Sequence, residues 1–334
     1  MMTPLFLFVL AILSGMICTW LARQFALRYD IVNRPTGLVP QHVKPVAYLG
    51  GIGIYLGILI VVLIATYKSH NIPLSFLALS AGFLILGVVD DLTIFSAKVK
   101  FAIQIILATV CVISGVYFPF VGHEILDMII SAFWIIVLVN AFNLTDVCDG
   151  LVGGLSVVAG LMIYFHASGA GLLPLIVAGS TIGFLVFNKP MASIFMGDAG
   201  SHVLGFIFAY FTMTLPEGHS VFYDFLPLAL ICGVVLFELI FLIFIRTQKG
   251  LKWWKGSKDH FALRLQAQGK SKWTTDFIAW SLGVLCGLPL VLHFLGRTSY
   301  YYWISVALIF GVFLAFGLYL LRIEARQNSA STSN

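Results

Sequence analysis

The sequence predicts an all-α, polytopic integral membrane protein with about eleven transmembrane helices. Hydrophobic residues make up 60% of the 334-residue chain and charged residues only 10%, and the mean hydropathy is +1.02. The apolar residues form long continuous runs, whereas a membrane β-barrel needs alternating segments of about ten residues. Because backbone that faces lipid must satisfy its own hydrogen bonds, these runs are expected to be helices.

Eleven apolar segments are candidate spans, although some are shorter than the roughly 20 residues that a span needs. They lie near residues 3–22, 46–66, 72–89, 101–119, 125–142, 151–168, 171–187, 199–215, 224–246, 276–295 and 300–321. The first segment lacks a basic start and a small-x-small cleavage site, so we expect a retained span and not a signal peptide. Residues 1–325 are expected to form a single transmembrane domain, and the polar residues 326–334 a disordered cytoplasmic tail.

The basic residues are sorted between the two ends of these spans. Of the 19 Lys and Arg residues, 17 fall after odd-numbered spans or in the C-terminal tail, and Lys68 and Arg297 fall on the opposite side. Basic residues accumulate on the cytoplasmic side of a plasma membrane. The sorting therefore predicts an outside N-terminus and a cytoplasmic C-terminus.

Carboxylates gather in three polar islands, all at predicted cytoplasmic ends of spans. The islands are Asp90-Asp91, the stretch 143–150 and the stretch 196–201. Carboxylates beside lipid are costly and tend to mark function. The adjacent pair Asp90-Asp91 repels itself, so it can serve as a base or be held by a cation. Taken singly, each island also fits an ordinary helix cap.

The second island carries oxygen donors at a spacing of three residues. Asn140, Asn143, Asp146 and Asp149 would lie on one side of a helix or tight turn. Mg²⁺ takes such ligands, usually one or two carboxylates completed by substrate phosphates. The pattern predicts a magnesium site, with Mn²⁺ as a substitute; the alternative interpretation is a polar loop with Asn and Asp as caps.

Basic groups face these islands across the predicted cytoplasmic surface. The loop 246–275 contains eight Lys and Arg residues together with His260. Attraction to anionic lipid explains the basic residues and tryptophans of an interfacial loop, but not this histidine. Acids that hold a metal and basic groups that hold an anion together predict bound phosphates.

Three further polar residues have no settled role in the sequence. Glu238, inside the ninth segment, is either functional or the partner of a neighbouring helix. His202 and Cys148 receive no role.

These residues, in this order, resemble the polyprenyl-phosphate N-acetylhexosamine-1-phosphate transferases of glycosyltransferase family 4. The resemblance spans roughly residues 33–265. It rests on Lys44 with Gly50-Gly51, Asp90-Asp91 with Lys100, Asn143-x-x-Asp146-x-x-Asp149-Gly150, Asn188 before Phe195-Met196-Gly197-Asp198-x-Gly200-Ser201, and the loop that bears His260. It implies Mg²⁺-dependent transfer of a sugar-1-phosphate from a UDP-N-acetylhexosamine to polyprenyl (undecaprenyl) phosphate. The products are a polyprenyl-diphospho-sugar and UMP, the first membrane step of an O-antigen or cell-wall polymer.

The resemblance also implies roles for individual residues and partners. Asn143 and Asp198 would be metal ligands, and Asp90 and Asp91 would be the catalytic pair that deprotonates or positions the lipid phosphate. The implied substrate contacts are Lys44, Lys100, Asp146, Asp149, Asn188 and His260. The implied partners are the UDP-sugar, the lipid phosphate, the membrane and a second copy of the chain, with no nucleic acid, and the active site would lie at the cytoplasmic face of the inner membrane.

The chain departs from the family pattern at two places. The second island lacks the first Gly of the family's Asp-Gly-x-Asp-Gly, and a single His260 stands where many members carry several histidines. Because that loop is associated with sugar recognition, an N-acetylated deoxyhexosamine fits at least as well as N-acetylglucosamine. The alternative function is a cation transporter, but a transporter places its acids near the midplane with access from both faces.

Overall fold

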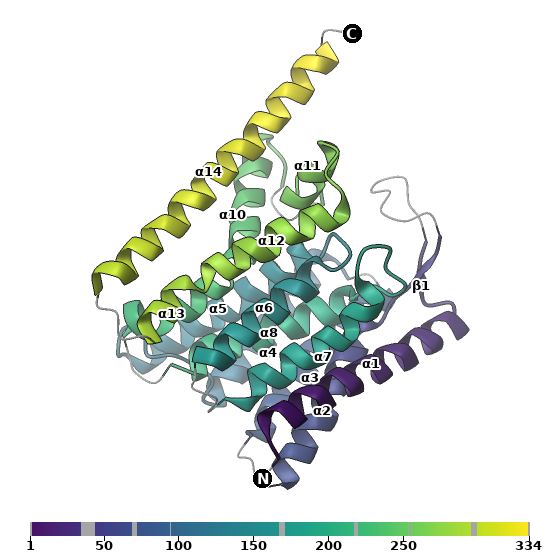
Figure 1. Cartoon of the computed structure of the whole chain (residues 1–334), viewed down its shortest axis with the longest axis vertical. Helices are drawn as coiled ribbons and strands as arrows, with labels where there is room; N and C mark the ends of the chain where they lie inside the picture. Colours follow the sequence, from purple (N-terminus) through teal and green to yellow (C-terminus); the bar gives the residue numbers. More distant parts are fainter. Residues whose placement is uncertain are drawn as a thin grey trace.

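The computed structural model describes residues 2–34, 44–68, 72–93, 95–166, 171–216, 220–252, 254, 256–294 and 299–332. This part of the chain is almost entirely helical, and its helices pack side by side in a bundle (Figure 1). The C-terminal helix α14, drawn in yellow, runs along one edge and projects beyond the bundle. The all-α prediction is confirmed.

The described elements follow one another as helices, apart from one small hairpin near the N-terminus. The helices are α1 (Pro4–Arg28), α2 (Gly50–Tyr67), α3 (Leu74–Thr93), α4 (Ala97–Ile113), α5 (Glu124–Thr145), α6 (Leu151–His166), α7 (Leu172–Asn188), α8 (Gly197–Thr214), the π-helix η1 (Val221–Phe225), α9 (Leu226–Ile231), α10 (Gly233–Gln248), α11 (Phe261–Ala267), α12 (Lys272–Cys286), α13 (Leu288–Phe294) and α14 (Ser299–Thr332). The strands are β1 (Val32–Asn33) and β2 (Val46–Ala47), paired antiparallel with Val32 opposite Ala47. Ala47 also bridges to Ile194, which brings the segment before α2 beside the segment before α8.

Helices occupy every segment that the sequence marks as a span. Among the described residues, six stretches are long and apolar enough to cross a membrane: Pro4–Arg28, Gly50–Tyr67, Leu74–Thr93, Glu124–Thr145, Lys272–Leu292 and Tyr300–Ile323. The bent pair formed by η1–α9 and α10 gives a seventh if it counts as one span, and α6 and α7 are shorter apolar helices. A polytopic membrane protein is confirmed, and the count of eleven spans stays a prediction.

The ninth predicted span, 224–246, is not a single straight helix. Val221–Ile231 and Gly233–Gln248 meet at an angle of 79°. Cys232, between them, leaves the helical conformation with φ −84° and ψ 12°. A Cβ on Gly233 would lie 2.8 Å from the sulfur of Cys286, so the bend packs the start of α10 closely against α12. Hydropathy indicates where the chain is apolar, but it does not indicate where a helix changes direction, so the sequence did not predict this bend.

The proposed boundary between a membrane domain, 1–325, and a tail, 326–334, stays a prediction. Helix α14 continues to Thr332, and residues 333–334 lie outside the described part of the chain, as does Trp253 of the basic loop.

Helix α8 is the central element of the bundle, and every residue from 199 to 213 is buried. Glycines let two neighbouring helices approach its first turn. A Cβ on Gly51 of α2 would lie 2.1 Å from the amide nitrogen of Gly200, and one on Gly87 of α3 would lie 2.3 Å from the carbonyl oxygen of Asp198. Close backbone approach through small residues is a common way to pack membrane helices. Here it fixes the start of α8, where the third acidic island lies.

Candidate active site

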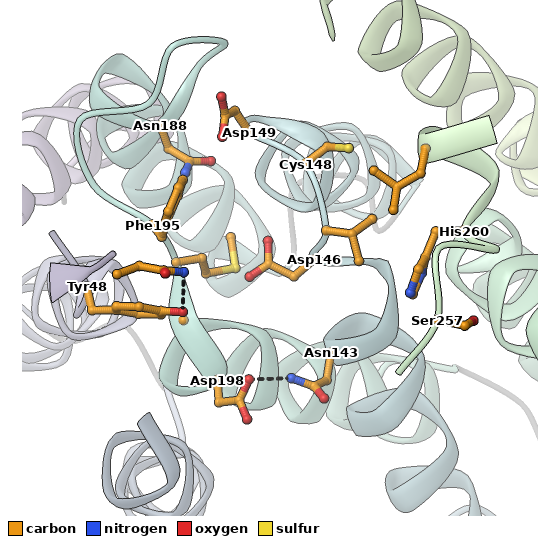
Figure 2. Close-up of a pocket in the computed structure, with 15 residues that line it drawn as sticks. Tyr48, Asn143, Asp146, Cys148, Asp149, Asn188, Phe195, Asp198, Ser257 and His260 are labelled. Carbon is orange, nitrogen blue, oxygen red and sulfur yellow. Dashed lines mark hydrogen bonds between the residues drawn. The ribbon is translucent and has the colours of Figure 1, made fainter. Parts of the chain in front are cut away.

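A pocket of about 280 Å³ lies where the start of α8 and the loop after α5 face the segment before α11 (Figure 2). Six of the ten predicted site residues line it: Asn143, Asp146, Asp149, Asn188, Asp198 and His260. The second island, the third island and the histidine of the basic loop, all far apart in the sequence, thus share one cavity. Their roles stay predictions, but their proximity is a property of the fold.

Asp198 is the junction between the three islands. The side-chain amide of Asn143 donates a hydrogen bond to Asp198 Oδ1 at 2.7 Å (Figure 2). Lys100 Nζ lies 2.5 Å from Asp198 Oδ2 and also pairs with Asp90. One continuous polar chain therefore runs from Asp90 through Lys100 and Asp198 to Asn143.

Asp91 anchors the first turn of α8. Its Oδ1 accepts the backbone N–H of Asp198 at 2.8 Å, and its Oδ2 accepts that of Ala199 at 3.1 Å. A carboxylate here satisfies N–H groups that lack partners within the helix and complements the helix dipole. Gly197, with φ +73°, makes the preceding turn, where a Cβ would lie 2.5 Å from Asp91 Oδ2. Asp91 thus has a structural connection to the site beside its predicted catalytic role.

Asp90 reaches the pocket indirectly. Its Oδ1 accepts the backbone N–H of Phe95 at 2.7 Å, and its other oxygen pairs with Lys100. Asp90, Asp91 and Lys100 do not line the pocket themselves, but each contacts Asp198 or a residue bonded to it. Lys44 is exposed, just before β2, and is not among the described residues that line the pocket.

The acids of the pocket influence one another. Burial, together with the negative charges of Asp198, Asp91 and Asp149, holds the pKa of Asp146 well above its usual range. Burial and the nearby acids raise the pKa of Tyr48 to about 12. The phenol oxygen accepts a hydrogen bond from the Asn33 side chain at 2.8 Å, and its own O–H can donate to an anion. Sequence reasoning did not single out Tyr48, because nothing distinguishes it within the segment 44–51.

The donors around this pocket fit a hard divalent cation. Asp146, Asp198 and Asn143 border the same opening and all carry oxygen donors, although the Asn143 amide must rotate to offer its oxygen (Figure 2). In the part of the chain that the structure describes, no three His, Cys, Asp or Glu side chains are grouped closely enough to hold an ion alone. Mg²⁺ held by one or two carboxylates and completed by substrate phosphates needs no such group.

Asp149 and Asn188 brace one wall of the pocket. Asp149 Oδ2 accepts hydrogen bonds from Lys272 Nζ at 2.7 Å and from the backbone N–H of Met191 at 3.2 Å. The Asn188 side chain accepts from Gly150 N–H at 3.0 Å and donates to the carbonyl of Ile194 at 2.9 Å. Together they join the loop 146–150 to the segment before α8. The sequence alone did not distinguish Lys272 from the other basic residues of the loop 246–275, which has eight in all.

All three residues left open by the sequence lie at this site: Cys148 lines the pocket, and Glu238 and His202 contact residues that do. Glu238 of α10 contacts the ring of His260, with Oε1 2.7 Å from Nδ1. His202 is buried in α8, with Nδ1 2.6 Å from the carbonyl oxygen of Asp198 and Nε2 3.2 Å from the amide of Gln104. Both are inward-facing partners of residues that line the pocket.

Comparison with known proteins gives the same family as the motifs. The sequence model of glycosyl transferase family 4 matches residues 73–216. A probable undecaprenyl-phosphate N-acetylglucosaminyl 1-phosphate transferase of Bacillus subtilis is 29% identical over 91% of this chain and 87% of its own length. The phospho-N-acetylmuramoyl-pentapeptide-transferase of Staphylococcus saprophyticus is 31% identical over 72% of this chain and 82% of its own length.

A third relative is similar along nearly the whole chain. The undecaprenyl-phosphate alpha-N-acetylglucosaminyl 1-phosphate transferase of Yersinia pestis is 25% identical over 95% of this chain and 90% of its own length. Similarity thus extends over the helices that carry all three islands and the basic loop. The chain belongs to glycosyl transferase family 4, within the superfamily of polyprenyl-phosphate sugar-1-phosphate transferases.

Proposed function

We propose that the protein transfers an N-acetylhexosamine-1-phosphate from a UDP-sugar to a polyprenyl phosphate. The observation that carries the proposal is the position of Asp198, which lines the pocket and is bonded to Asn143, to Lys100 and, through its backbone, to Asp91. Relatives named as polyprenyl-phosphate sugar-phosphate transferases support the same reaction.

In the proposed reaction, an oxygen of the lipid phosphate forms a bond to the β-phosphorus of the UDP-sugar. The bond from that phosphorus to the oxygen bridging to the α-phosphorus breaks, and UMP leaves with the electron pair. Phosphoryl transfer needs positioning and charge neutralisation from the protein more than covalent chemistry. We assign Asp90, Asp91 and Lys100 to the lipid phosphate, with an Asp accepting its proton if it arrives protonated.

The six predicted residues that line the pocket are assigned to the donor. Asn143 and Asp198 are the proposed ligands of Mg²⁺ or Mn²⁺, which would neutralise the diphosphate and make its phosphorus more electrophilic. His260, which borders the pocket on the side away from Tyr48 (Figure 2), is proposed to contact the donor diphosphate or its sugar. Asp146, Asp149 and Asn188 are proposed to form the part of the pocket that binds the nucleotide of the donor.

The proposed location is the inner membrane, with the pocket at its cytoplasmic face. The sorting of 17 of 19 basic residues to one side supports this orientation. The product would then be the first lipid-linked intermediate of a cell-surface polysaccharide, either O-antigen or a cell-wall polymer. A homodimer remains part of the proposal.

Release of UMP by the purified protein tests this function. The reaction would contain polyprenyl phosphate, Mg²⁺ and one UDP-sugar at a time, including N-acetylglucosamine, N-acetylgalactosamine and N-acetylated deoxyhexosamine donors. We expect UMP only when lipid phosphate and metal are both present, with loss on chelation and recovery with Mg²⁺ or Mn²⁺. Release that does not depend on the lipid phosphate, or no release with any donor, would contradict the proposal.

A further inference from the structure

The carboxylate of Glu238 is fully buried, and both of its oxygens contact the start of α11. Oε1 lies 2.7 Å from Nδ1 of His260, and Oε2 accepts the backbone N–H of Phe261 at 3.2 Å. A buried carboxylate is costly unless it is paired and hydrogen-bonded. The pairing explains how an acid is tolerated inside an apolar helix.

We propose that Glu238 is a positioning residue, which orients the His260 ring so that Nε2 faces the donor diphosphate in the pocket. This inference rests on the proposed function. Nδ1 is engaged by the carboxylate, so Nε2 is the nitrogen left for the pocket, which His260 lines. When both nitrogens carry protons, Glu238 balances the charge and Nε2–H can donate to a phosphate oxygen. Carboxylates that orient a working histidine in this way are common behind metal and catalytic sites.

The backbone on either side of His260 is also held. Asp259 pairs with Lys249 at 2.5 Å and with Arg264 at 2.9 Å. Arg264 in turn donates to the carbonyl of Leu320 on α14 at 3.3 Å. The loop therefore reaches the pocket with its main chain fixed by Asp259 and Arg264, which leaves ring orientation as the task for Glu238. Preorganisation of this kind is what a binding group needs to act at a defined position.

Two roles of Glu238, a purely structural one and the positioning of His260, predict different kinetics for variants at these two residues. If Glu238 served only to satisfy the Phe261 amide and hold α10 against α11, its removal would cost activity whether or not His260 was present. If it acts through the ring, its removal costs nothing further once the ring is gone. The two roles are therefore separated by the coupling between the two substitutions.

A double-mutant cycle measures this coupling. Glu238→Ala and His260→Ala should each lower kcat/KM for the UDP-sugar by about tenfold or more, mainly through KM, with the KM for polyprenyl phosphate unchanged. The double variant should be no worse than His260→Ala alone. Glu238→Gln keeps an acceptor for the ring and should fall between the wild type and Glu238→Ala. Glu124→Ala, an exposed acid in the first turn of α5, is the matched control and should retain wild-type kinetics.

Thermal unfolding in detergent accompanies each variant, and Glu238→Gln carries the test if Glu238→Ala does not fold. The inference would be overturned if the fold-losses in kcat/KM of the two single variants multiplied in the double variant. It would also be overturned if the KM for polyprenyl phosphate rose as much as the KM for the UDP-sugar, or if neither Glu238 variant folded. These results would leave the proposed function intact as long as the wild type releases UMP. A wild type that releases none contradicts the proposed function and the inference together.

Discussion

At the scale of single residues, Asp198 shows what the sequence could and could not predict. Its motif marked it as a site residue, and the resemblance marked Asn143 and Lys100 as well. The contacts among them join residues 55 and 98 positions apart, and no local pattern encodes such pairings. Tyr48 and Lys272 were missed for the same reason, because each gains its place only from tertiary packing. Glu238 and His260 were both singled out, but their pairing was not predicted.

Replacing Asp198 should remove activity without unfolding the protein. Asp198→Ala loses a proposed metal ligand and leaves the Asn143 amide and Lys100 without their shared partner. Loss of one preorganised electrostatic group costs about 10²–10³-fold in rate, so we expect at least this loss in UMP release. Glu124→Ala serves as the control, and normal Mg²⁺-dependent activity in Asp198→Ala would remove this residue from the mechanism.

Asp146 should make stability depend on pH. Its pKa is raised in the folded protein by burial and by Asp198, Asp91 and Asp149, so the folded state keeps a proton that the unfolded chain releases above about pH 3.9. The contribution of Asp146 to the free energy of unfolding is therefore lost as the pH rises from its pKa in the unfolded chain, about 3.9, to its raised pKa in the folded protein. Without Mg²⁺, the Tm of the wild type should fall more from pH 5 to pH 8 than the Tm of Asp146→Asn. Equal slopes would show that Asp146 is not the group responsible.

At the scale of elements, hydropathy predicted where helices lie but not how they meet. All eleven apolar segments contain helices, because burial in lipid and burial in a bundle select the same residues. The 79° break after Ile231 escaped prediction, since hydropathy does not indicate a change of helix direction. The two-residue strands β1 and β2 also escaped, being too short to show any alternation.

The close approach of α3 to α8 should be intolerant of a single methyl group. In Gly87→Ala the new Cβ would lie 2.3 Å from the carbonyl oxygen of Asp198 and 2.4 Å from the amide of Ala199, so the first turn of α8 must move. Overpacking of this kind costs about 1–3 kcal/mol, and we expect a lower Tm together with reduced UMP release. Gly82→Ala on the same helix is the control, because its Cβ meets only the flexible Leu107 side chain at 3.0 Å. Indistinguishable behaviour of the two variants would argue against this packing role.

At the scale of the whole molecule, the site requires its loops to share one side of the membrane. Single cysteines at Lys98 and Lys270 should react with a membrane-impermeant thiol reagent only from the cytoplasmic side, and one at His123 only from outside. All three positions are exposed, whereas the five native cysteines are buried. Outside labelling at Lys98 or Lys270 would contradict the predicted orientation.

The most direct test of the central proposal follows the β-phosphate of the donor. The protein would be given a UDP-sugar carrying ³²P in the β-position, polyprenyl phosphate and Mg²⁺, and the lipid and aqueous products would be separated. Transfer of a sugar-1-phosphate predicts that the label enters the lipid fraction while unlabelled UMP appears in equal amount, and that Asp198→Ala gives neither. Transfer of the sugar alone would leave the label in the aqueous fraction as UDP, and that result would contradict the proposed reaction.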